Sequence, residues 1–380
     1  MKITDIKADY YQVPLSKSVR MATAPDKTSD KWSFTLVKVF TDEDIIGIGV
    51  QDVHFPEWAK YVERTYKPIL LNEIVEPYYV EKFARYLRYT GPQFPSPRAC
   101  AIEIALWDII GKKAKLPIYK LFGAYQDKVK AYASILEPYP LWGPKQWTKF
   151  AKQLVDEGFK GLKFHIGALW PNPNNIIEVV KDIRENLGYD FDIMIDAMQA
   201  WTDHSIYDLH SSIKYANGLE KYEVAWLEEP LNHFYNPDLS SQLCRIVDMP
   251  IAGGGAMFGL QHYKTVLETG ALDIVQPDVM HNGMMEVRRI ALLAESMGKV
   301  CVPHYFGVGV SLAATLQVIG STDIGWVEYP YSPPSHTVES RDAMMKKPIK
   351  IDKDGYVEIP KGPGLGIELN EVFLEKYVVK

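Results

Sequence analysis

Short apolar runs recur along the chain from residue 128 onward, and their even spacing limits the possible fold more than any other feature. The runs lie at residues 128–136, 161–166, 191–196, 224–228, 250–253, 272–277, 299–304 and 325–330. From the second run on, their ends are roughly 24 to 33 residues apart, which is the length that a strand, a helix and two loops require. Helical patterns, such as residues 147–159 and 284–298, lie between them.

Eight evenly spaced strand and helix units predict an α/β fold of the (β/α)8 barrel type. A doubly wound open sheet is the alternative, and the even spacing favours the closed barrel. The first third follows another pattern: residues 2–13 and 33–50 alternate like strands, and residues 56–113 have helical periodicity. The polar segment between the strands, Ser16–Asp30, is expected to be a mobile loop. Strands followed by helices without alternation indicate an α+β unit.

Charge and cysteine content narrow the classes of function. With 42 Lys and Arg against 48 Asp and Glu, the chain carries a formal net charge of −6 and no basic run, which argues against nucleic acid or an anionic membrane as partner. Three scattered cysteines (Cys100, Cys244 and Cys301) are too few for a disulfide framework or a zinc site. The N-terminus lacks a signal-peptide pattern, and the least polar run, Gly307–Gly320, is shorter than the roughly 20 residues that span a bilayer. A cytoplasmic enzyme is expected.

Polar side chains stand where the predicted barrel strands end, which is where active sites of such barrels lie. Asp196 and Glu228 end neighbouring strands, and paired oxygen ligands of this kind suit Mg²⁺. One carboxylate at a strand end is more often a loop or capping residue, but two on neighbouring strands that follow a lysine favour a metal site. The other polar residues at strand ends are Lys163, His165, Glu229, Asp278, His304 and Glu328.

Two pairs among these residues have both a structural and a catalytic interpretation. Lys163 and His165 are two residues apart and so face the same side of a strand; taken alone, they suggest a surface lysine and a hydrogen-bonded core histidine. Asp278 and His304 end strands that follow one another, so the carboxylate could orient the imidazole for acid or base catalysis. A structural aspartate with a satisfied buried histidine is an equal alternative for this pair.

Taken in order, the motifs resemble the enolase superfamily, in its mandelate racemase-like branch, over essentially the whole chain. The similar segments are ALWDIIGKKAKLPIYKLFG, GLKFHIG, IDAMQAWT, WLEEPL, PIAGGG, QPDVMHNG, VPH, WVEYP and GPGLG. The resemblance implies a modified barrel at residues 126–340. It also implies an α+β capping domain built from residues 1–125, with a contribution from residues 341–380.

The resemblance also implies a role for each matching residue. Asp196 and Glu228 would bind Mg²⁺, which holds the substrate carboxylate while the proton α to it is removed. Lys163 would neutralise that carboxylate, and His165 would be one acid or base. On the opposite face, Asp278 and His304 would form the second acid or base, with Glu328 hydrogen-bonded to the carboxylate.

Three residues depart from the family pattern. Gly255 stands where the family has its third metal-ligating Glu, His165 replaces a Lys, and Met198 replaces an Asn. The change at 165 favours dehydration or one-sided proton transfer over racemisation. Loss of the carboxylate should weaken Mg²⁺ binding, and Glu229, expected on the other face of its strand, is a poor substitute. A two-carboxylate metal site, a metal-free scaffold and an inactivated site therefore stay open, and Gly253–Gly255 offers a less favoured alternative, an anion site formed by backbone amides.

In this branch the capping domain selects the substrate. The segments 16–30 and 51–58 are the candidates, with Arg20, Trp32, His54 and Trp58 as possible contacts, and His233 and His281 as further hydroxyl binders. The activity implied first is dehydration of an aldonic or other sugar acid to a 2-keto-3-deoxy acid. A racemase or epimerase of a 2-hydroxy acid and a catalytically silent member are the alternatives. Relatives commonly form dimers or octamers, so a homo-oligomer is expected.

Overall fold

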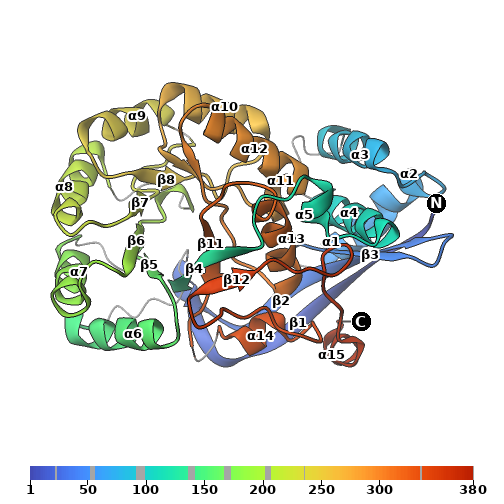
Figure 1. The fold of residues 1–380 in the computed structure, drawn as a ribbon, viewed down its shortest axis with the longest axis horizontal. Helices are drawn as coiled ribbons and strands as arrows, with labels where there is room; N and C mark the ends of the chain where they lie inside the picture. Colours follow the sequence, from blue (N-terminus) through green and yellow to red (C-terminus); the bar gives the residue numbers. More distant parts are fainter. Residues whose placement is uncertain are drawn as a thin grey trace.

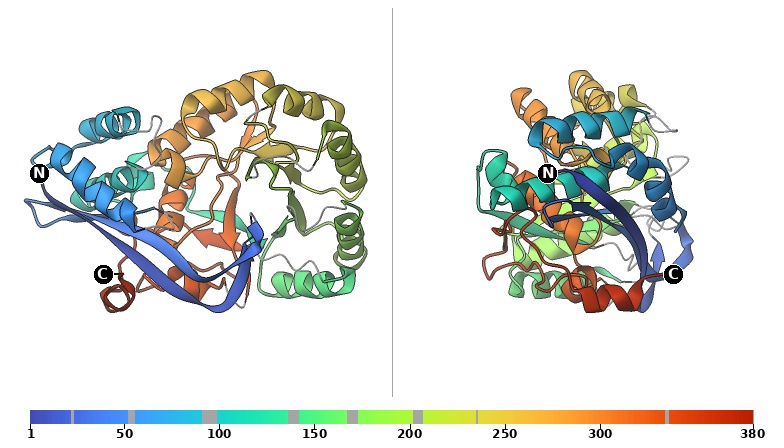
Figure 2. Two further views of the ribbon diagram at one scale, coloured as in Figure 1. Left: turned by 180° about the vertical axis from the view of Figure 1, so that it is seen from behind. Right: turned by 90° about the vertical axis from the view of Figure 1, so that its right-hand side faces the viewer.

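The fold comes from a computed structural model, which describes residues 1–21, 24–51, 56–90, 99–135, 142–166, 173–201, 207–234, 236–333 and 336–379. An antiparallel sheet with helices lies beside a curled parallel sheet that is surrounded by helices (Figure 1). The two views in Figure 2 show the long N-terminal hairpin running along one side of the barrel. Within the described ranges, no helix combines the length and apolarity needed to cross a membrane.

The N-terminal sheet has three antiparallel strands in sequence order: β1 (Ile3–Met21), β2 (Ala24–Thr41) and β3 (Ile46–Gln51). The predicted loop at residues 16–30 is wrong, because β1 and β2 continue through it with Val19 opposite Ser29. Each strand supplies the backbone hydrogen-bond partners of the other, so polar side chains are tolerated there. A register shift follows Pro14, which has no N–H for the ladder.

Helical segments pack beside this sheet. They are α1 (Glu57–Tyr61), the π-helical turn η1 (Val62–Tyr66), α2 (Lys67–Leu70), α3 (Pro77–Thr90), α4 (Cys100–Ala114) and α5 (Ile118–Leu121). In α4 every residue from Cys100 to Gly111 is buried. A helix that is buried on all sides must be covered on all sides, and α4 contacts β3 as well as the barrel helices.

In the part of the chain that the structure describes, eight parallel strands form the barrel sheet, and each predicted run contains one of them. They are β4 (Lys128–Ile135), β5 (Gly161–His165), β6 (Asp192–Asp196), β7 (Trp226–Glu228), β8 (Ile251–Gly253), β9 (Ile274–Val275), β10 (Val300–Cys301) and β11 (Trp326–Pro330). Neighbours pair in the order β11-β4-β5-β6-β7-β8-β9-β10. The predicted fold class is confirmed, although no ladder joins β10 to β11 within the described residues.

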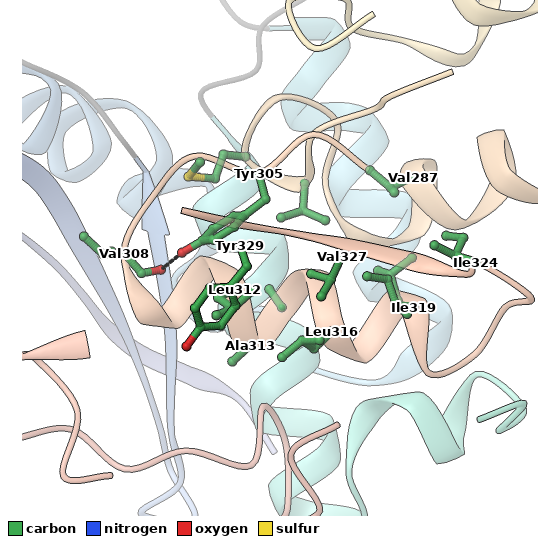
Figure 3. Packing of buried hydrophobic residues seen from close by; sticks show 14 of the residues in the cluster. Val287, Tyr305, Val308, Leu312, Ala313, Leu316, Ile319, Ile324, Val327 and Tyr329 are labelled. Atoms are coloured by element: carbon green, nitrogen blue, oxygen red, sulfur yellow. Dashed lines mark hydrogen bonds between the residues drawn. The ribbon is translucent and has the colours of Figure 1, made fainter. Parts of the chain in front are cut away.

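The outer ring and the loops at the strand ends contribute further helices. They are α6 (Pro144–Asp156), α7 (Pro173–Leu187), a 3₁₀ turn η4 (Gln199–Trp201), α8 (Leu209–Glu220), α9 (Pro237–Ile246), α10 (Leu260–Thr269), α11 (Val279–Asn282), α12 (Met284–Ser296), α13 (Gly309–Ile319) and α14 (Val338–Asp342). All residues of α13 are buried. Figure 3 shows Leu312 and Leu316 of this helix beside Val327 and Tyr329 of β11.

The barrel interior is filled by large side chains that form a floor below the strand ends. Tyr132, Met194, Trp226, Ala252, Ile274 and Val302 form one buried cluster, with Trp326 packed against it. Side chains two positions further along a strand point the same way. Asp196, Glu228, Gln276, His304 and Glu328 therefore stand in the next layer, above the floor, at the open end of the sheet.

The C-terminal tail contacts both halves of the fold. Strand β12 (Tyr356–Glu358) pairs antiparallel with β4, while α15 (Glu371–Tyr377) lies against β1 and Val378 bridges to Tyr11. The tail thus adds a strand to the barrel sheet. It also adds a helix to the N-terminal unit of β1–β3 and α1–α5, which we call the capping unit.

One buried carboxylate joins the capping unit to the tail. Asp108 of α4 accepts the backbone N–H of Ile48 at 3.0 Å and that of Leu365 at 2.8 Å. Lys112 Nζ lies 2.6 Å from the same carboxylate. Next to Leu365, Gly364 has φ +69°, and a Cβ there would lie 2.1 Å from Asp108 Oδ1. The glycine therefore allows the tail to approach the helix.

We expect Gly364→Ala to lower the melting temperature clearly, because it adds both a steric conflict with Asp108 and a side chain in the left-handed region. Gly325→Ala is the matched control, since a Cβ at Gly325 meets nothing within 4 Å. Thermal unfolding followed by circular dichroism measures both. Equal melting temperatures would contradict the close approach.

Candidate active site

The pairing register of the parallel strands brings the site residues together at the ends of β5, β6 and β7. His165, Asp196 and Glu228 are direct neighbours in the two parallel ladders. His165 Nε2 lies 3.3 Å from Asp196 Oδ2. All three side chains are buried. The sheet therefore brings together the imidazole and the two predicted metal-binding carboxylates.

Lys163 is the positive centre of this site. Its fully buried ammonium lies 2.8 Å from Glu228 Oε1, 2.8 Å from Glu328 Oε1 and 3.7 Å from Asp196 Oδ2. Although burial alone would lower it, Glu228 and Glu328 raise the pKa of Lys163 well above its usual value. In return, and against the effect of burial, Lys163 and His304 lower the pKa of Glu328 to about 2. The interpretation of Lys163 as a surface residue is therefore wrong.

Glu228 and Glu328 accept hydrogen bonds from several donors that do not belong to the predicted site residues. Glu228 Oε2 accepts from Trp226 Nε1 at 3.1 Å and from Gln276 Nε2 at 2.7 Å. Glu328 accepts from Ser134 Oγ at 2.6 Å and from the Tyr305 amide at 3.0 Å. Strand periodicity could have found Trp226 and Gln276, since they lie two positions before Glu228 and Asp278. Because Glu328 is ionised in this environment, it accepts rather than donates, and its contact with a substrate stays a prediction.

Negative charge exceeds positive charge around Asp196. Burial and the neighbouring Glu228 raise the pKa of Asp196 well above its usual value. Burial and Glu228 also raise the pKa of Glu229 to about 7. Among the described residues, Lys163 is the one buried ammonium group at this end of the barrel. Five buried carboxyl groups surround it, namely those of Asp196, Glu228, Glu229, Asp278 and Glu328.

His165 keeps a lone pair directed into the site. Its Nδ1 lies 2.8 Å from the carbonyl oxygen of Ile135. Because a carbonyl oxygen can only accept, Nδ1 carries the hydrogen and Nε2 is unprotonated in the neutral ring. Burial and the positive charge of Lys163 lower the pKa of His165 to about 4. His165 is therefore neutral at pH 7, and its unprotonated Nε2, which faces Asp196 Oδ2 at 3.3 Å, can accept a proton.

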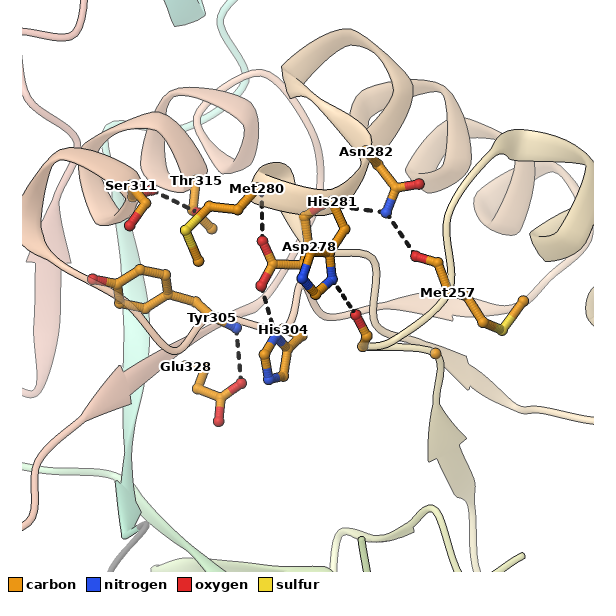
Figure 4. A network of polar contacts seen from close by, with 12 residues as sticks. Met257, Asp278, Met280, His281, Asn282, His304, Tyr305, Ser311, Thr315 and Glu328 are labelled. Carbon is orange, nitrogen blue, oxygen red and sulfur yellow. Dashed lines mark hydrogen bonds and ion pairs between the residues drawn. The ribbon is translucent and has the colours of Figure 1, made fainter. Parts of the chain in front are cut away.

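His304 is in the opposite protonation state. Its Nδ1 lies 2.7 Å from Asp278 Oδ2, and Asp278 is fixed in turn by the amide of Met280 at 2.6 Å (Figure 4). Although burial opposes it, the hydrogen bond to Asp278 and the charge of Glu328 raise the pKa of His304 to about 9. The ring of Trp201 lies 5.7 Å from that of His304, centroid to centroid. The ring of His304 is thus positively charged at pH 7, with Nε2–H available as an acid.

The end of β8 is built from glycines. A Cβ at Gly255 would lie 3.0 Å from the ring of His304, so the place of the absent carboxylate is bordered by this imidazole. The Gly254 amide donates to Glu229 Oε1 at 3.4 Å, and the Gly255 carbonyl contacts His281 Nδ1 at 2.9 Å. In the alternative anion site at Gly253–Gly255, one backbone amide, that of Gly254, already donates to Glu229. His233 is buried beside Gly253.

Most predicted substrate contacts from the capping unit lie apart from these residues or outside what is described. His54 and the side chain of Arg20 lie outside the described part of the chain. Trp58 is 1% exposed and belongs to the main hydrophobic core. Trp32 of β2 stacks on Phe306, two residues after His304, at 5.8 Å between ring centroids. The hairpin therefore contacts the loop that carries the acidic imidazole, while the substrate roles of Arg20, His54 and Trp58 stay predictions.

The donor set fits a divalent cation in charge and in type. Asp196 and Glu228 offer hard oxygen ligands on paired positions, and burial together with the charge of Glu228 raises the pKa of Asp196. No three His, Cys, Asp or Glu side chains in the described ranges converge as a finished metal cage. An ion held here would need water or a substrate, or one more protein ligand, to complete its coordination shell.

Family models match both parts of the chain. The model described as enolase C-terminal domain-like matches residues 146–372. The model of the mandelate racemase / muconate lactonizing enzyme N-terminal domain matches residues 6–123.

Two characterised relatives and a solved structure extend this similarity. The chain is 33% identical to an arabinonate dehydratase of Saccharolobus solfataricus over 330 residues, covering 84% of this chain and 83% of the relative. It is 31% identical to a D-galactarolactone cycloisomerase of Agrobacterium fabrum over 396 residues, with 99% of each covered. A crystal structure of an enolase superfamily member from Polaromonas sp. JS666 has a TM-score of 0.86 at 26% identity, covering 100% of this chain and 98% of that chain.

Proposed function

The chain belongs to the mandelate racemase / muconate lactonizing enzyme family of the enolase superfamily, and from this premise we propose that it is a Mg²⁺-dependent sugar acid dehydratase. The observation that carries the proposal is the pair of buried imidazoles at the strand ends. His165 presents an unprotonated Nε2, and His304 presents a protonated one. A base and an acid of opposite state are what removal of a proton and a hydroxyl group requires.

The reaction would start at the carbon next to the carboxylate. His165 Nε2 takes the α-proton, and the electron pair of the C–H bond moves onto the substrate carboxylate. Mg²⁺, when bound at Asp196 and Glu228, would offset the negative charge that develops there. Lys163 adds a fixed positive charge at the same end of the barrel, and Glu328 holds it in place.

The leaving group departs from the neighbouring carbon. As the electron pair returns to form a C=C bond, the bond from C3 to its hydroxyl breaks, and His304 Nε2–H protonates the departing oxygen to give water. The remaining enol becomes the 2-keto-3-deoxy acid by taking up a proton at C3. Asp278 does not touch the substrate in this scheme; it orients His304 and keeps it charged.

Purified protein, Mg²⁺ and a panel of aldonic and aldaric acids test the proposal. We expect at least one member to give a 2-keto-3-deoxy acid, detected by the colour reaction of such acids with thiobarbiturate after periodate cleavage. Proton NMR in D₂O follows exchange of the α-proton in parallel. Exchange without dehydration would indicate a racemase or epimerase instead, and neither product nor exchange with any member would contradict the proposed chemistry.

The pH profile should report His304. As an acid it must be protonated, while the base His165 must be unprotonated, so kcat is expected to be flat between about pH 4 and about pH 9 and to fall about tenfold per pH unit above pH 9. Asp278→Asn replaces the charged acceptor that raises this pKa with a neutral one, while burial still lowers the pKa, so the falling limb should move to lower pH. A limb at the same pH in wild type and Asp278→Asn would contradict the assignment.

A further inference from the structure

The buried side-chain amide of Gln276 reaches the carboxylate of Glu228 across an intervening strand. Gln276 is 0% exposed and directly follows β9, whereas Glu228 ends β7, and β8 lies between these two strands. Gln276 Nε2 donates to Glu228 Oε2 at 2.7 Å. At the end of β8, Gly253 and Gly254 have no side chain that could stand between the two groups. The glycines of β8 therefore leave this contact open.

The charge of Glu228 determines which end of the Gln276 amide faces it. Glu228 lies 2.8 Å from the Lys163 ammonium and is an acceptor, so the amide must present its NH₂ group to the carboxylate and not its oxygen. In this orientation Gln276 Oε1 is buried without a hydrogen-bond partner in the described part of the chain. An unpaired buried oxygen is unfavourable, and an apolar side chain would fill the same space without it. A role in packing alone is therefore a poor explanation for this amide.

The two oxygens of Glu228 differ in the partners that hold them. Oε2 accepts from Gln276 Nε2 and also from Trp226 Nε1, at 3.1 Å. Oε1 lies 2.8 Å from Lys163 Nζ. Because a carboxylate oxygen accepts about two hydrogen bonds, Oε2 is filled by these two N–H groups, while Oε1 keeps one position beside the lysine. Glu228 can therefore bind a cation through Oε1 without losing any of these three partners, next to its ladder neighbour Asp196.

We propose that Gln276 is a positioning residue of the metal site, which together with Trp226 holds Glu228 so that Oε1 is presented to the ion. The inference rests on the Mg²⁺ dependence of the proposed function. Gln276 touches neither the ion nor the substrate in this role and acts only through Glu228. Without its amide, Oε2 keeps a single N–H donor, and the carboxylate is free to turn away from Asp196. Because Gly255 brings no carboxylate, the orientation of each remaining ligand matters more.

Direct metal binding tests this role without any substrate. Full-length wild type and Gln276→Met, whose side chain has a similar length but no donor, are titrated with Mg²⁺ by calorimetry and with Mn²⁺ by electron paramagnetic resonance. Circular dichroism and thermal unfolding are measured on the same preparations. We expect Gln276→Met to weaken both affinities by about 10- to 100-fold. Gln153→Met is the matched control: Gln153 is exposed and also donates to a glutamate, Glu157, at 2.8 Å, so its loss should leave metal affinity unchanged.

A second variant keeps the test decisive if Gln276→Met does not fold. Trp226→Phe removes the other N–H group from Glu228 Oε2 but leaves an aromatic ring in the barrel floor, and it should also bind both ions more weakly than wild type. Metal binding by wild type with unchanged affinity in the folded variants would overturn this inference alone, even if their melting temperatures fall. Absence of any binding to wild type would overturn the inference together with the Mg²⁺ dependence of the proposed function.

Discussion

Replacing His304 with asparagine is expected to lower kcat for dehydration by about 100- to 10,000-fold, the range that a positioned acid or base contributes. Asparagine keeps a polar side chain beside Asp278, but it cannot donate a proton to the departing hydroxyl. Because α-proton removal is assigned to His165, exchange of that proton in D₂O should be reduced less than dehydration. This difference between the two rates is the mark of an acid that acts on the leaving group.

The control for this substitution is His262→Asn, which changes an exposed histidine of α10 that contacts a backbone carbonyl. It should leave both rates unchanged. Steady-state kinetics measures dehydration, and NMR measures α-proton exchange, on the same preparations of wild type and both variants. A His304→Asn enzyme that dehydrates within tenfold of the wild-type rate would remove His304 from the mechanism, and an equal loss of both rates would make it the base.

Replacing Lys163 with methionine is expected to cost about 3–5 kcal/mol of unfolding free energy, because it leaves two fully buried carboxylates without their cation. Glu228 and Glu328 are each 2.8 Å from the ammonium and are 3% and 0% exposed, so water replaces the cation poorly. Lys353→Met, at an exposed side chain, is the matched control and should change stability little. Urea unfolding in the presence of a metal chelator measures both.

The size of this loss should depend on pH. The lowered pKa of Glu328, about 2, means that its ionised form stabilises the fold above the unfolded value of 4.5. That contribution is lost as pH falls through 2. The difference between wild type and Lys163→Met should therefore be full above pH 4.5 and shrink below it. A difference that stays constant from pH 7 to pH 3 would show that the lysine acts by packing and not by charge.

Both predictions depend on which charged side chains lie next to one another, and the strand pattern alone does not show this. The periodicity of apolar runs predicted the eight barrel strands, because each unit must bury an apolar strand and return through a helix of similar length. The same pattern placed Asp196, Glu228 and Glu328 at strand ends. It could not predict the β1–β2 hairpin through residues 16–30, because polar strands gain their partners only from each other.

The sequence by itself determined the barrel, the strand that carries each candidate group, and the absence of a carboxylate at Gly255. The tertiary structure alone decided how those groups act on one another. Lys163 and Glu328 are on strands remote in sequence, and their meeting at 2.8 Å fixes which carboxylates are neutralised. Electrostatic energy depends on distance and burial, and both are properties of the assembled barrel.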